Sequence, residues 1–128
     1  MSNLVVSNIS DGTTSVGTGY VVNGAAKAWV NLTQVSTQTI RDSLNVSSLT
    51  DLGTGQTRIS FASSMNNDDF AGSFYTMASA GENYSNFGND YAGGFGDKAA
   101  SSVQAYSHNG TAAVDSAIVD IIIMGDLA

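Results

Sequence analysis

The sequence predicts an all-β protein, an antiparallel β-sandwich of jelly-roll-like type. Apolar and polar residues alternate with a period of two in several short segments, and no segment has a convincing helical period. Charged residues make up only 12% of the chain, so Ser, Thr, Asn and Gly supply the remaining polar surface, and these residues favour turns and strand edges over helix interiors. Six to eight short strands of this kind are typical of a sandwich.

The 128 residues fit one domain, which we expect over residues 20–128 behind an N-terminal attachment segment, residues 1–19. Within that segment, residues 4–9 form a short strand candidate, followed by the turn signal Ser10-Asp11-Gly12. The Gly- and Thr-rich remainder is expected to be extended. Residues 20–22 then lead into a turn at Asn23-Gly24.

The first core strand is predicted over residues 26–32. One face carries Ala26, Ala28, Val30 and Leu32, and the other carries Lys27, Trp29 and Asn31. Trp29, the only tryptophan, therefore projects from the nominally polar side. Either it is covered by another segment or a neighbouring subunit, or it lies flat over Lys27, half-exposed.

A hairpin is predicted between residues 40 and 61, with its turn in the Gly-rich run 50–55. Its first arm places Ile40, Leu44 and Val46 on one face, and a phase slip at Ser47-Ser48 indicates a β-bulge. Its second arm turns Thr57, Ile59 and Phe61 the same way. Residues 63–69 form a polar loop.

Two later strands are apolar on both faces. In residues 70–78, Phe70 and Phe74 oppose Tyr75 and Met77, and residues 117–124 alternate in the same manner. The second of these strands is expected to be central or at a subunit interface, because its sheet must be covered on both sides. The candidate subunit-interface residues are Trp29, Tyr75, Ile122 and Met124.

Between these strands, residues 81–97 mix aromatic rings with Gly, Asn, Ser and Asp, a composition typical of binding loops. The candidate receptor-binding residues are Tyr84, Phe87, Asn89, Asp90, Tyr91 and Phe95. The alternative is that some rings plug the end of the sandwich, and we favour this alternative for Phe87 and Phe95. Residues 101–107 form a weaker strand before the turn 108–110.

Charge and composition argue against several classes of partner. The net charge is −7, and the four basic residues are scattered, so phosphate-mediated binding to nucleic acid is not expected. The longest apolar run, residues 121–124, is far too short for membrane insertion. The chain has no cysteine, and its N-terminus lacks the pattern of a secretory signal, so we expect synthesis in a cytoplasm.

No catalytic, metal or cofactor site is predicted. His108 is the only histidine and falls in a predicted turn, so a serine-type triad is not favoured. Asp68 and Asp69 are adjacent in a loop, unlike the spaced carboxylates of a glycosidase. The run 66–69 also lacks the alternate spacing and the bidentate Glu of a calcium loop.

Four segments resemble a recurrent module of tailed-bacteriophage tail-fibre and virion structural proteins. They are SNISDGTTSV (7–16), YVVNGAAKAWVN (20–31), IRDSLNVSSLTDLGTG (40–55) and VDIIIMGD (119–126), with AKAWVN and DSLNVSSLTD-x-GTG carrying most of the resemblance. The family often has Pro in place of Gly17 and Asn in place of Leu52. Residues 66–109 lie outside the resemblance and are expected to vary, as a receptor-contacting region does.

The resemblance implies a non-enzymatic virion protein on the exterior of the particle, made in the host cytoplasm. A tail fibre or receptor-binding tip would be a homotrimer, attached to other virion proteins through residues 1–19 and touching a host-surface glycan or protein through residues 81–97. The alternative is a capsid decoration protein, either cement or head fibre. A tailspike-like glycan hydrolase is a third and less favoured class, because no usable carboxylate pair is evident.

Overall fold

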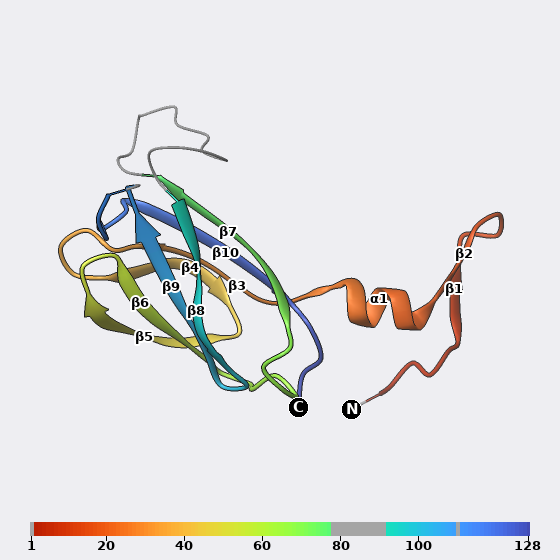
Figure 1. The fold of residues 1–128 in the computed structure, drawn as a ribbon. Coiled ribbons are helices and arrows are strands. Elements are labelled where there is room, and N and C mark those ends of the chain that lie inside the picture. Colours follow the sequence, from red (N-terminus) through yellow and green to blue (C-terminus); the bar gives the residue numbers. More distant parts are fainter. Residues whose placement is uncertain (1, 78–91, 110) are drawn as a thin grey trace.

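The fold is an antiparallel β-sandwich preceded by a projecting N-terminal arm (Figure 1). The computed structural model describes residues 2–77, 92–109 and 111–128. Two four-stranded sheets face each other, which confirms the predicted class. The oligomeric state stays a prediction, since a single chain is described.

The first sheet has the strand order β4-β3-β10-β7 and the second has the order β5-β6-β9-β8. All pairings are antiparallel. In chain order the strands are β3 (Ala26–Thr33), β4 (Thr39–Leu44), β5 (Val46–Gly53), β6 (Gln56–Phe61), β7 (Ala71–Met77), β8 (Ala92–Ala99), β9 (Ser102–His108) and β10 (Ile118–Met124). Hairpins join β3 to β4, β5 to β6 and β8 to β9, and long-range pairing joins β3 to β10 and β6 to β9.

The chain crosses between the sheets at Asn45. This residue has a positive φ of 56° and separates β4 in the first sheet from β5 in the second. Its side chain holds the corner, with Nδ2 donating to Ser63 O and Oδ1 accepting from Ser63 N. The sequence predicted one continuous arm here, and that prediction is wrong because the chain changes sheet at Asn45. Leu44 is exposed because a register shift in the β3–β4 pair, between Asn31 and Leu32, places it opposite the outward-facing Trp29. The predicted bulge is confirmed by a register shift between Val46 and Ser48.

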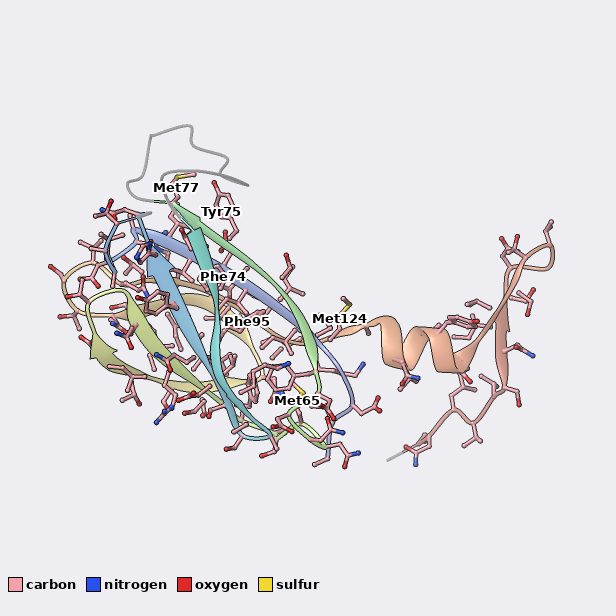
Figure 2. All side chains as sticks on the ribbon, viewed as in Figure 1. Met65, Phe74, Tyr75, Met77, Phe95 and Met124 are labelled. Carbon is pink, nitrogen blue, oxygen red and sulfur yellow. The ribbon has the colours of Figure 1, made fainter. Side chains whose placement is uncertain are left out.

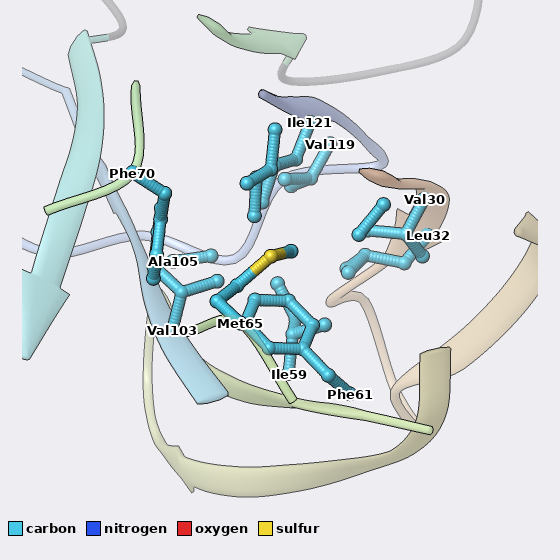
Figure 3. Close-up of a cluster of buried hydrophobic side chains, with 12 residues drawn as sticks. Val30, Leu32, Ile59, Phe61, Met65, Phe70, Val103, Ala105, Val119 and Ile121 are labelled. Atoms are coloured by element: carbon cyan, nitrogen blue, oxygen red, sulfur yellow. The ribbon is translucent and has the colours of Figure 1, made fainter. Parts of the chain in front are cut away.

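The core lies between the two sheets (Figure 3). The predicted inward residues of β3 and β6 are buried, apart from half-buried Ala26. Strand β9 contributes Val103 and Ala105 to the core, and β10 contributes Val119, Ile121 and Ile123. Two core residues come from the segment before β7: Phe70, whose ring meets that of Phe61 edge-on at 5.8 Å, and Met65, which is 1% exposed. Met65 was not expected in the core, because the sequence around it is polar.

A buried polar group closes one end of the sandwich. Gln34 follows β3 and is 1% exposed, and its side chain donates to Thr57 Oγ1 at 3.1 Å and accepts from Ser116 N at 3.1 Å. Its backbone N–H also donates to Ser116 O at 2.9 Å. These bonds tie the ends of three segments together. Hydrogen bonding of this kind offsets the desolvation penalty of a buried polar group.

The N-terminal arm, residues 2–24, contains a small hairpin and a helix. Strands β1 (Asn8–Ser10) and β2 (Ser15–Gly17) pair around the predicted turn, and α1 spans Thr18–Gly24. The helix was not predicted, since Gly, Val and Tyr are weak helix formers. Lys27, just after the helix, stabilises its C-terminal end. Its Nζ donates to Val22 O and Ala25 O, and so satisfies carbonyls at the end of α1. The first strand of the sandwich begins at Ala26.

Candidate functional site

All four strands of the first sheet carry apolar side chains on their outer side, interleaved with polar ones. In β10, Val119, Ile121 and Ile123 point into the core, so the alternate residues point outward. Pairing places Trp29 beside Ile122 and Leu44 beside Trp29, while Tyr75 lies beside Asp120 and Met77 beside Ile118. We call this surface the apolar face and define it by Trp29, Leu44, Tyr75, Met77, Ile118, Ile122 and Met124.

All four predicted interface residues belong to the apolar face. Trp29 and Tyr75 are half-buried, whereas Ile122 and Met124 are 49% and 42% exposed. Figure 2 shows Tyr75 and Met77 on β7 near one end of the sandwich and Met124 near the other end, where the arm leaves. The structure thus brings together residues that are distant in sequence, and it adds Leu44, which the register shift in the β3–β4 pair turns outward.

The outer surface of the second sheet is polar by comparison. Its two central strands present Gln56, Arg58, Ser60, Ser102, Gln104 and Tyr106. Gln104 Nε2 donates to Gln56 Oε1 at 2.9 Å, and the Tyr106 ring stacks on His108 with centroids 6.1 Å apart. The two outer surfaces therefore differ in kind, and only the first resembles the centre of a protein interface in composition.

Within the apolar face lies a shallow depression lined by Trp29, Asn31, Asp120 and Ile122. Asn31 Nδ2 donates to Asp120 Oδ1 across the β3–β10 pair, so this carboxylate has a protein partner. A hydrogen-bonded carboxylate among apolar side chains is compatible with a covering partner, because a buried charge without a partner would be costly.

The arm exposes apolar side chains along its length. Val5 is 92% exposed and Tyr20 is 80% exposed, and no residue of α1 is buried. The other exposed apolar residues of the arm are Leu4, Val6, Ile9, Val16, Val21 and Val22. In Figure 1 the arm runs away from the sandwich, so the chain itself does not cover these side chains. An arm of this composition has the properties of a segment that is buried in an assembly.

Most of the predicted receptor-binding residues, namely Tyr84, Phe87, Asn89, Asp90 and Tyr91, lie outside the described residues. Phe95 lies in β8 opposite Ala105, and its ring packs edge-on against Phe74 at 5.9 Å. It is partly buried against the core, in line with the alternative interpretation of this ring. The prediction of a loop through residue 97 is wrong from Ala92 onward, because residues 92–99 form β8.

The polar candidates of the sequence lie apart from one another. His108 ends β9, whereas Asp68 and Asp69 are exposed in the segment before β7. Among the described residues, no three His, Asp or Glu side chains gather closely enough to hold a metal ion. In the same part of the chain, no helix has both the length and the apolar character needed to cross a membrane.

Comparison with known proteins gives no assignment: no protein-family profile, curated protein or solved structure matches this chain. The candidate functional site is therefore defined by physical features alone, namely the apolar face and the arm.

Proposed function

We propose that this chain is a non-enzymatic structural protein of a phage virion, a homotrimeric tail fibre or receptor-binding tip on the exterior of the particle. The observation that carries the proposal is the pair of uncovered apolar surfaces, the apolar face and the arm. The kind of assembly comes from the resemblance of segments such as AKAWVN to virion modules.

Burial energetics support assembly. Full burial of an exposed Ile or Met side chain contributes about 1.5–3 kcal/mol, and several such residues remain uncovered in the single chain. The chain has no cysteine, so disulfides do not supplement its core. Association would cover these side chains and stabilise each subunit by linkage.

We assign host contact to the segment between β7 and β8. Aromatic rings at Tyr84 and Tyr91 would stack on sugar rings or apolar groups, and Asn89 and Asp90 would supply hydrogen bonds. Phe95 is left out of this assignment, because its ring packs against Phe74 between the sheets. The partner would be a glycan or protein of the host surface.

The projecting arm favours one alternative of a different class, a capsid decoration protein bound to the phage head. In that case the arm would bind the capsid lattice, and the segment between β7 and β8 would have no receptor. Copy number separates the two functions, since a tail tip is present in far fewer copies than a decoration protein.

The test is immunogold imaging of intact particles with an antibody against this protein, together with quantification of its copies per particle. We expect label confined to the tail end. Label spread over the head would replace the tail assignment with decoration, and particles without label would overturn the virion role altogether. Light scattering on the purified chain tests the trimer, which a stable monomer at micromolar concentration would contradict.

A further inference from the structure

We infer that the arm of one copy binds the apolar face of a neighbouring copy, so that subunits are joined by arm exchange. This inference rests on the proposed function, because it names the partner of surfaces that the proposal assigns to assembly. The partner of both surfaces is then a second copy of this chain. Three features of the chain lead to it: the direction of the arm, its charge, and the matching apolar character of the two surfaces.

The direction of the arm is fixed at its junction with the sandwich. Only Ala25 separates α1 from β3, and its N–H donates to Val21 O at 3.2 Å. Lys27, on the outward side of β3, donates to Val22 O and Ala25 O. The arm would have to reverse at Ala25 and lose these bonds in order to cover its own sheet. It therefore reaches outward, toward another molecule (Figure 1).

The distribution of charge favours the arm of a second copy, rather than its apolar face, as the surface that covers the apolar face. Residues 2–25 contain one charged side chain, Asp11, among many Ser, Thr, Asn and apolar residues. The outer surface of the first sheet carries Lys27, Asp42 and Asp120. Two such surfaces packed face to face would bring the carboxylates of both copies into one desolvated interface, which is unfavourable. An almost uncharged arm covers the same surface without adding like charge.

The two surfaces also match in character. The arm offers exposed Leu, Val, Ile and Tyr side chains, and the apolar face offers Trp29, Ile122 and Met124 around a shallow depression. A contact between an arm and a face joins two different surfaces, so it is heterologous and can close into a ring such as a trimer. Each subunit then donates one arm and receives one.

The test uses two full-length variants that damage one surface each. The face variant is Ile122→Lys, which places a charge beside Trp29. The arm variant replaces exposed side chains that make no buried contact: Leu4→Ser, Val5→Ser, Tyr20→Ser and Val22→Ser. Ser48→Lys is the matched control, since Ser48 is exposed on the outer side of the second sheet, opposite Ser60. Circular dichroism checks that each variant is folded.

Sedimentation measures association of each variant alone and of the two mixed. We expect each variant alone to be monomeric, the mixture to form a 1:1 complex, and Ser48→Lys to associate like the unmodified chain. The unmodified chain should also show emission from Trp29 at shorter wavelength, with weaker acrylamide quenching, than the arm variant does.

Other outcomes overturn arm exchange. Self-association of the arm variant alone would indicate face-to-face packing, and self-association of the face variant alone would indicate arm-to-arm contact. A mixture without complex, or a monomeric unmodified chain, would remove the inference as well. Immunogold label on particles decides the virion role independently, so the two proposals can fail separately.

Discussion

The ring of Phe95 fills the space in which a side chain at Gly72 would lie. A Cβ added to Gly72 would be 2.6 Å from Phe95 Cζ and 3.0 Å from Ile122 O. Gly72 lies in β7 and Phe95 in β8, edge strands of opposite sheets. Because Gly72 has no side chain, the Phe95 ring of the facing edge strand can close this side of the sandwich.

Gly72→Ala should destabilise the sandwich by about 1–3 kcal/mol, because the added methyl group overpacks the site of Phe95. Urea denaturation of the purified variant measures the change. Gly94→Ala in β8 is the control, since a Cβ there meets nothing within 4 Å. The double variant Gly72→Ala, Phe95→Leu should recover part of the loss, and equal costs at both glycines would contradict this account.

Gly55→Ala should be among the most damaging substitutions in the chain. Gly55 has a φ of +69°, and a Cβ there would lie 2.5 Å from Ser107 O and 2.8 Å from Val114 N. Its backbone is also tied in place, with its N–H donating to Asp115 Oδ1 at 2.7 Å. Gly53 also has a positive φ but an open surround, so thermal unfolding of Gly53→Ala isolates the backbone strain. We expect Gly55→Ala to cost about 1–3 kcal/mol more.

Met65→Ala should cost about 2–5 kcal/mol in unfolding free energy, because it leaves a cavity in the core. Met124→Ala removes the same side chain from the apolar face, where it is 42% exposed. We expect that variant to change the stability of the isolated subunit by only about 0.5 kcal/mol. Denaturation at concentrations that give monomers compares the two directly, and similar costs would mean that Met124 is covered within one chain.

The turn of the arm hairpin should loosen at acidic pH. The backbone N–H groups of Thr14 and Thr13 donate to Asp11 Oδ1, and this lowers the pKa of Asp11 below its ordinary value of 3.8. A lowered folded-state pKa stabilises the turn above pH 3.8, and this contribution is lost as the pH falls through the folded-state pKa. An NMR titration of the Thr13 and Thr14 amides measures the transition. Asp11→Asn should abolish it, whereas an unchanged titration would assign it to another group.

The local sequence pattern was sufficient to predict facing in strands where apolar and polar residues alternate strictly. The inward residues of β6 were read directly from period two, because side chains of a strand alternate between its faces. The predicted interface residues followed from the same rule, since Trp29 and Ile122 stand out on faces opposite the core. Partial sequence signals also marked the hairpin turns, where Gly and Asp supply the required backbone geometry.

Other features depended on contacts between segments far apart in the sequence. β8 is rich in glycine and lacks a strand signature, and it forms because β9 pairs with it and Phe95 reaches the core. Met65 is buried through a bridge to Leu127 and a bond from its N–H to Ala100 O, although its neighbours are polar. Leu44 faces outward because a register shift in the β3–β4 pair places it opposite Trp29.

The sequence by itself therefore determined an all-β chain, the facing of its most regular strands and the residues of a candidate interface. Only the tertiary structure decided the strand order, the helix in the arm and the meeting of the interface residues on one sheet. The physical reason is that alternation fixes which side of a strand is apolar, whereas pairing and sheet crossing decide what that side lies against.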